Sequence, residues 1–229
     1  NGVNSAEFSP VDKDEKLLAE MKLEGSIVIG YVGSIVPYEG LDILVEAVSK
    51  LPKPIKKMLK IVIIGDGSDS DRIQSLVAER NLCDEFIFTG RIEHDRIKDY
   101  YSVLDAIVLP RKSEEVCEIV PPLKPLEAMS MGKLVICSDV DPSVELIRGN
   151  FNGVLFEKDN SRSLSETIVE VVSNLDRFRE IGNNSRQWVQ ENRDWNEITG
   201  IIEELYSLLR FRDLARSRQN RVREISQVA

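Results

Sequence analysis

Glu118 and Glu127 lie in one segment, 111–127, with the adjacent cations Arg111 and Lys112. Arg111 and Lys112 directly follow the apolar run 106–109, which is typical of a short buried strand. Two consecutive prolines at 121–122 then predict the start of a helix, because proline lacks a backbone N–H and its φ is already helical. Since a helix amino end beside cations favours an anion, we expect a phosphate-bearing ligand here.

The two glutamates suit a different part of such a ligand. Glu127 lies one turn inside the expected helix, and its carboxylate would repel a phosphate. We therefore interpret Glu127 as an acceptor for neutral hydroxyl groups, such as those of a ribose. Glu118 falls in the loop that we expect before the helix. Each glutamate taken alone also fits an ordinary surface carboxylate, and that alternative stays open.

Composition excludes several classes of protein. The chain has 229 residues, of which 42% are hydrophobic and 30% charged, as in an ordinary globular protein. Its net charge of −9 argues against general nucleic-acid binding, which depends on Lys and Arg contacts to phosphates. No apolar run approaches the roughly 20 residues of a membrane span. The three cysteines have no metal-ligand spacing, so we expect a soluble protein of the reducing cytoplasm.

Apolar runs of strand type alternate with helical patterns along the chain. Helical spacing follows the first run in the segment 41–51, and a capping box at 163–166 predicts a later helix start. This alternation predicts an α/β fold with a doubly wound, Rossmann-like parallel sheet of about six strands. Ligands of such sheets bind beyond the carboxyl ends of the strands. The expected strands are 26–32, 60–64, 85–89, 106–109, 134–137 and 154–156.

The segment EIVPPLKPLEAMSMGKLVICSDVDPSVELI resembles the signature of family 4 glycosyltransferases, the group 1 glycosyl transferases. The resemblance extends from about residue 1 to about residue 209. It implies the carboxy-terminal, donor-binding domain of a retaining enzyme of the GT-B fold. In that family two glutamates, separated by seven residues, contact the donor sugar and the ribose. Glu127 matches the second, and Glu118 lies one residue further back than the first, so a one-residue insertion would align it as the catalytic residue.

Other family positions are altered in this chain. Gly33 and Gly40 frame GSIVPYEG, and Ser34 and Glu39 stand where the family has the arginine and lysine that hold the diphosphate. We infer that Arg111 and Lys112 compensate, with Lys124 as a third candidate. The segment 90–92 resembles the family's contact with the base, although a turn glycine and an exposed arginine explain it equally well. The expected nucleotide-sugar contacts are Gly33, Ser34, Arg91, Ile92, Arg111, Lys112, Leu123, Lys124 and Glu127.

No metal or cofactor is expected apart from the nucleotide-sugar itself. The aspartate pairs 69/71 and 139/141 mimic a metal-binding DxD. The first pair lies at a predicted helix start, where carboxylates commonly cap N–H groups, and the second resembles the family's S-D-V-G-G. Since no carboxylate and histidine cluster of metal-ligand character is apparent, we predict a metal-independent reaction. His94 is the only histidine and is left out of the predicted catalytic set.

The two ends of the chain suggest its partners. The opening NGVNSAEFSP resembles the segment that follows the interdomain hinge in the family, which implies that an amino-terminal acceptor domain is missing. We expect a nucleotide-sugar domain at 1–209 and a basic helical tail at 210–229. Six arginines and two acidic residues give this tail a net charge of +4. The tail is interpreted as a solvated helix end or as a contact to an anionic membrane or to the missing domain.

The resemblance therefore implies the donor domain of a retaining glycosyltransferase. Such an enzyme moves a sugar from a UDP- or GDP-sugar to an acceptor hydroxyl, in polysaccharide or glycoconjugate synthesis. A non-catalytic nucleotide-binding or regulatory domain of the same fold is the alternative, which the altered Ser34 and Glu39 keep open. A dinucleotide oxidoreductase is disfavoured, because no GxGxxG follows the first expected strand.

Overall fold

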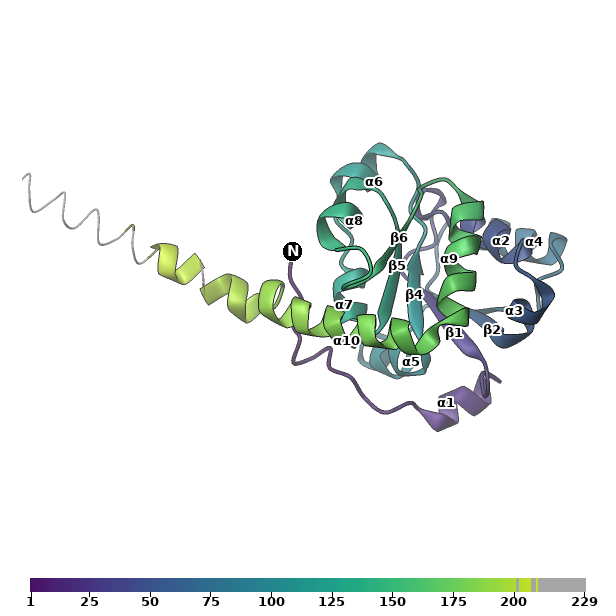
Figure 1. Ribbon diagram of the computed structural model, residues 1–229, viewed down its shortest axis with the longest axis horizontal. Coiled ribbons are helices and arrows are strands. Elements are labelled where there is room, and N and C mark those ends of the chain that lie inside the picture. The colour runs from purple at the N-terminus through teal and green to yellow at the C-terminus, as the bar shows by residue number, and fades with distance from the viewer. Residues whose placement is uncertain (201, 207–208, 210–229) are drawn as a thin grey trace, which may run out of the picture.

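The computed structural model describes residues 1–200, 202–206 and 209, and contains one sheet of six parallel strands (Figure 1). The strand order is β3-β2-β1-β4-β5-β6, so the chain reverses direction across the sheet between β1 and β4. This confirms the predicted doubly wound α/β fold. The strands are β1 (Ile27–Val32), β2 (Leu59–Ile64), β3 (Phe86–Gly90), β4 (Ala106–Leu109), β5 (Leu134–Ser138) and β6 (Val154–Phe156).

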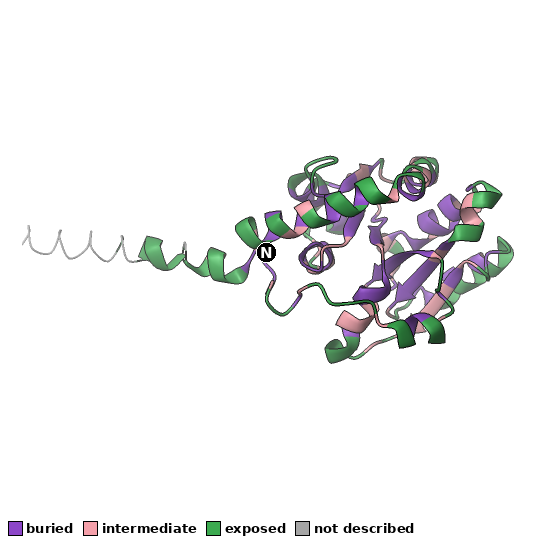
Figure 2. Ribbon diagram, turned by 60° about the horizontal axis from the view of Figure 1, so that its bottom comes forward, coloured by how far each residue is buried: buried purple, intermediate pink, exposed green. Residues whose placement is uncertain are grey.

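Helices cover both faces of the sheet (Figure 2), and β1, β4 and β5 are consequently buried throughout, whereas most residues of β3 are half-buried. The helices are α1 (Glu15–Glu20), α2 (Leu41–Ser49), α3 (Lys53–Met58), α4 (Ser70–Glu79), α5 (Ile97–Val103), α6 (Glu115–Ile119), α7 (Lys124–Ser130), α8 (Asp141–Leu146), α9 (Ser161–Ser173) and α10 (Leu175–Asn192). Two short 3-10 helices are η1 (Pro37–Glu39) and η2 (His94–Arg96).

The alternation of side chains in β1 separates two hydrophobic cores. Ile29 and Tyr31 pack with residues of α2, α4 and α9 on one face of the sheet. Val28 and Val32 pack with residues of α1, α5 and α7 on the other. Helix α10 contributes to both cores, because its first half packs with the former and its last turn with the latter. A strand buried on both faces has no polar alternation, which is why these strands read as continuous apolar runs.

Several local predictions are corrected by the structure. A short helix, α6, replaces the expected loop around Glu118, and α7 begins at Lys124 rather than at prolines 121–122. The proline in the first turn of α7 is Pro125, where a missing N–H costs nothing. Helix α9 is capped by Asn160, whose side chain accepts from two backbone N–H groups, and not by a capping box from Ser163. Helices α3 and α10 were not predicted.

The amino-terminal segment pairs with the residues that directly follow α10. The backbone N–H of Val3 donates to Arg193 O at 2.9 Å, and Trp195 N–H donates to Val3 O at 3.1 Å. After α10 a further helical segment at 195–200 leads away from the sheet (Figure 1). No helix in the described residues is long and apolar enough to cross a bilayer. The predicted basic tail, 210–229, lies outside the described residues.

Candidate functional site

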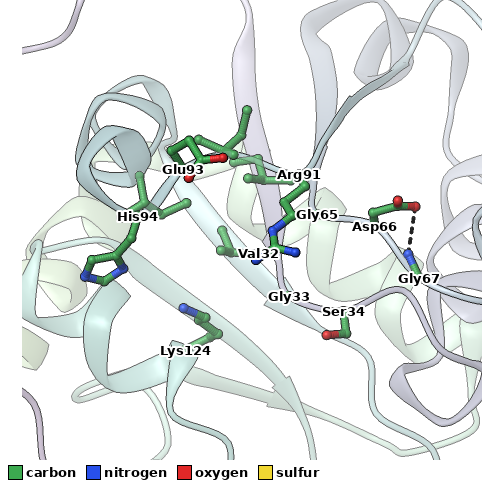
Figure 3. Close-up of a pocket in the computed structure, with 13 residues that line it drawn as sticks. Val32, Gly33, Ser34, Gly65, Asp66, Gly67, Arg91, Glu93, His94 and Lys124 are labelled. Carbon is green, nitrogen blue, oxygen red and sulfur yellow. Dashed lines mark hydrogen bonds between the residues drawn. The ribbon is translucent and has the colours of Figure 1, made fainter.

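A cavity of about 700 Å³ opens at the carboxyl edge of the sheet (Figure 3). Its walls are the turns that follow three neighbouring strands, residues 32–34 after β1, 64–67 after β2 and 91–94 after β3. Ile97 of α5 and Lys124 of α7 complete the lining. Because α7 follows β4, the cavity spans the point where the strand order reverses, which is where ligands of such sheets bind.

Glycine backbones hold the three turns together. Gly33 N–H donates to Ile64 O, and Gly65 N–H donates to Gly90 O, each at 3.0 Å. Gly65 has a φ of 139°, and a Cβ there would lie 1.9 Å from Gly33 O. Only glycine fits at this position, so the turns after β1 and β2 pack backbone against backbone. The close packing leaves the space above these turns open for a ligand.

Asp66 fixes the turn after β2. Its Oδ1 accepts from the Ser70 hydroxyl and from Gly67 N–H, both at 2.8 Å. The bond from Ser70, followed by that from Gly67, lowers the pKa of the Asp66 carboxyl. The carboxylate is therefore committed to shaping the turn at the start of α4.

Two cationic side chains line the cavity, Arg91 from the turn after β3 and Lys124 from the first turn of α7. Figure 3 shows the two side chains reaching the cavity from separate elements. Lys124 Nζ lies 2.9 Å and 3.0 Å from the two carboxylate oxygens of Glu127, on the same helix. Of the predicted contacts, Gly33, Ser34, Arg91, Ile92 and Lys124 are thus brought together here.

Glu127 lies in a second cavity, of about 320 Å³, which shares His94 with the first. Leu123, Trp195 and the amino-terminal residues around Phe8 also line this second cavity. The Tyr101 hydroxyl donates to Glu127 Oε2 at 3.1 Å. Burial, followed by the charge of Glu127, raises the pKa of Tyr101 well above its usual value, so the hydroxyl remains a donor. The carboxylate of Glu127 is therefore held at the boundary between the two cavities.

Arg111 and Lys112 do not line the first cavity. Arg111 is buried, its Nε lies 3.2 Å from Glu39 Oε1, and its Nη1 donates to Val120 O at 2.8 Å. Lys112 Nζ lies 2.8 Å from Asp42 Oδ2. Both cations are paired with carboxylates of the segment that follows β1, so this geometry does not favour the expected compensation for Ser34 and Glu39. The sequence indicated the charges but not their partners.

Glu118 lies apart from both cavities. Its carboxylate accepts from Asp141 N–H at 2.8 Å and from the Ser113 hydroxyl at 3.0 Å, and it pairs with Lys158 Nζ. The bond from Lys158 is the largest of the effects that lower the pKa of Glu118. The residue therefore ties α6 to the start of α8 and to the loop after β6.

The aspartate pairs also have protein partners. Asp69 pairs with Arg72 through contacts of 2.6 Å and 2.7 Å, and Asp139 Oδ1 accepts from Lys158 N–H at 2.7 Å. In the part of the chain that the structure describes, no three His, Cys, Asp or Glu side chains are grouped to hold a metal ion. Asp69 occupies the predicted helix start, although its side chain makes no cap hydrogen bond.

Sequence reasoning missed Tyr101 and Lys158. The Tyr101 hydroxyl contacts a glutamate 26 positions away. Lys158 contacts Glu118 from 40 positions away. Neither contact has a signal in local spacing, because both depend on the packing of separate elements.

Known proteins share this architecture. The family model for group 1 glycosyl transferases matches residues 12–188. An uncharacterized glycosyltransferase of Methanocaldococcus jannaschii is 21% identical over 208 residues, covering 91% of this chain and 51% of the relative. Anabaena HepE in complex with UDP-glucose superposes with a TM-score of 0.79 at 20% identity, covering 90% of this chain and 56% of that one.

A second solved structure clarifies the extent of the match. The carboxy-terminal domain of the group 1 glycosyl transferase LpcC from Francisella tularensis superposes with a TM-score of 0.73 at 24% identity, covering 85% of this chain and all of that one (100%). The chain spans about half the length of the curated relatives it matches. Because the family model matches most of its residues, this chain belongs to the group 1 glycosyl transferase family.

Proposed function

We propose that this chain binds a nucleotide-sugar and forms the donor half of a retaining glycosyltransferase. The enzyme would transfer a hexose from a UDP- or GDP-sugar to an acceptor hydroxyl, in polysaccharide or glycoconjugate synthesis. The observation that carries the proposal is the cavity of about 700 Å³ at the strand-order reversal, lined by glycine turns and by two cations. HepE, which has the same fold, was crystallised with UDP-glucose.

The lining suggests an orientation for the ligand. Arg91 and Ile92 lie on the β3 side and suit the base, whereas Gly33 and Ser34 allow a diphosphate to approach the backbone. Glu127 at the boundary with the second cavity suits the ribose hydroxyls. The donor sugar would then extend toward Glu118, the proposed catalytic residue, which would orient the sugar and support charge at its anomeric carbon.

Titration calorimetry with UDP, GDP, uridine and guanosine tests the proposal on this chain. We expect one of the diphosphates to bind more tightly than its nucleoside, because the cations add to the contacts of the base and ribose. Arg91→Gln should weaken binding of the preferred diphosphate, whereas Arg162→Gln should not, because Arg162 is exposed at the start of α9 and does not line the cavity. The absence of binding by both UDP and GDP would refute the proposal.

The contacts of Glu118 are also compatible with a second function, that of a non-catalytic nucleotide-binding domain. Its carboxylate contacts Ser113, Asp141 and Lys158, and Ser34 and Glu39 replace family cations. Slow hydrolysis of UDP-glucose or GDP-mannose distinguishes the two functions. The measurement needs a longer protein, in which this chain is joined to the half of its relatives' length that it does not match. A catalytic Glu118 requires that hydrolysis falls in Glu118→Gln, whereas a non-catalytic domain hydrolyses neither donor.

A further inference from the structure

We infer that Lys124 is the cation that binds the diphosphate, and that it is released from Glu127 when the ligand's ribose hydroxyls replace it on the carboxylate. The free protein would then contain the Lys124–Glu127 ion pair. In the complex each partner would contact the nucleotide instead. This inference rests on the proposed function and identifies the residue pair that couples recognition of ribose to recognition of phosphate.

The ion pair lies across the boundary between the two cavities. Lys124 lines the larger cavity, and Glu127 lines the smaller one. The Lys124 side chain keeps 36% of its surface exposed, against 14% for that of Glu127. The ammonium group is therefore the accessible partner on a flexible stem, whereas the carboxylate is held in place by the Tyr101 hydroxyl.

The acceptor capacity of Glu127 permits the exchange. An ionised carboxylate has about four acceptor positions. In the free protein one is taken by Tyr101 and two by contacts to Lys124 Nζ. The two vicinal hydroxyls of a ribose can take the positions that Lys124 leaves, while Tyr101 stays in place. After the exchange both charged groups still have hydrogen-bond partners, because the carboxylate accepts from the ribose hydroxyls and the ammonium group donates to the phosphates.

The other cations near this edge are already committed. Arg111 is paired with Glu39 and Lys112 with Asp42, and neither lines the larger cavity. Arg91 makes no ion pair in the described part of the chain, but it comes from the turn that follows β3, on the side proposed for the base. Lys124 is therefore the lining cation whose partner a nucleoside can replace.

Inorganic pyrophosphate isolates the phosphate contact from the base and the ribose. Glu127→Gln frees Lys124, so we expect pyrophosphate to bind about 2- to 5-fold more tightly, the range expected when a competing part-exposed ion pair is removed. The same variant should bind uridine more weakly, because its amide is a poorer acceptor for ribose hydroxyls. Lys124→Gln should bind pyrophosphate more weakly, and Lys124→Arg should retain most of the affinity.

The double variant Lys124→Gln/Glu127→Gln separates release of the lysine from simple removal of a repulsive charge. If release is the cause, the gain from Glu127→Gln disappears in the Lys124→Gln background. A gain of the same size in both backgrounds overturns the inference. Glu20→Gln is the matched control, since it removes one charge from an exposed Lys–Glu pair on α1 and should leave pyrophosphate affinity unchanged.

Circular dichroism of each variant establishes that it is folded before titration. UDP binding by the unaltered chain, together with pyrophosphate affinity that Lys124→Gln leaves unchanged, overturns only this inference. Failure of the unaltered chain to bind UDP and GDP overturns the proposed function as well. The two failures are therefore distinguishable in one set of titrations.

Discussion

Glu39 and Arg111 form an ion pair between the segment after β1 and the loop after β4. Arg111 is 4% exposed, and the Glu39 side chain is 16% exposed. Burial raises the pKa of the Glu39 carboxyl, and the guanidinium of Arg111 opposes this effect without cancelling it. Glu39 stands where the family resemblance places a phosphate-binding lysine. Here the position instead contributes one half of an internal ion pair.

Removing Arg111 should destabilise the protein through the carboxylate that it leaves behind. We expect Arg111→Met to lower the free energy of unfolding by about 3 kcal/mol, because Glu39 loses its cation while remaining largely buried. Urea unfolding followed by circular dichroism measures the change. Arg162→Met, which removes an exposed pair with Glu166, should cost less than about 0.5 kcal/mol and serves as the control.

The loss in Arg111→Met should depend on pH. A carboxyl whose pKa is raised by folding binds more protons in the folded state, so its contribution to stability falls as pH rises through the raised pKa. Without Arg111 the pKa of Glu39 rises further. The variant should therefore lose less stability at about pH 5 than at about pH 8. Adding Glu39→Gln should abolish this difference, and an equal loss at both pH values would contradict the explanation.

At the scale of elements, the turn between β1 and α2 is locked to the loop after β4. Lys112 N–H donates to Tyr38 O at 3.0 Å. Gly40, which precedes α2, has a φ of 75°, and a Cβ there would lie 1.9 Å from Pro110 O. The loop after β4 thus passes directly over Gly40. The loop can take this position only because Gly40 has no side chain.

Gly40→Ala should therefore force the two segments apart. We expect a loss of at least about 2 kcal/mol in the free energy of unfolding, from the strained positive φ together with the clash against backbone. Thermal and urea unfolding measure it. At Gly149 a Cβ would meet nothing within 4 Å, so Gly149→Ala should have little effect. Similar losses in both variants would mean that the contact with Pro110 is unimportant.

The elements themselves were largely predictable. All six strands were anticipated within a residue or two, because most of them are buried on both faces and leave apolar runs in the sequence. Helix α10 was missed because polar and charged residues together dominate it, with the apolar contacts spaced widely at Phe178, Ile181 and Trp188. The start of α7 was misplaced because a proline pair also fits an extended segment, and only tertiary packing decides between the two.

The site was predictable only in part. Glycines after strands and the glutamate of a known motif are visible in local sequence, and Gly33 and Lys124 do line the cavity. The partners of charges are not visible. Arg111 contacts Glu39, 72 positions away in the sequence, and Lys112 contacts Asp42, 70 positions away. Local spacing therefore gave no sign that either cation has a carboxylate partner. Electrostatic pairing is a property of the assembled sheet, and it is the reason why we propose Lys124 for the phosphate contact.

At the scale of the whole molecule, we expect the chain to bind a sugar donor without transferring the sugar to an acceptor. It spans about half the length of its curated relatives, and we propose that the acceptor half of the enzyme corresponds to the part of those relatives that it does not match. We expect calorimetry to detect binding of UDP-glucose or GDP-mannose, and mass spectrometry to detect no transfer to a panel of sugar acceptors. Efficient transfer by these residues alone would show that the donor half carries the complete active site.

The position of β1 at the centre of the sheet also has a consequence for synthesis on the ribosome. Its residues pair with β2, as Ile29 does with Ile61, but its other side pairs with β4, whose first residue is Ala106. Until that strand emerges, a nascent chain that has paired β1 with β2 carries an open edge of six residues that are buried in the finished protein. Unpaired apolar edges promote association between chains. We therefore expect the central strand β1 to favour association between chains while the protein is half made.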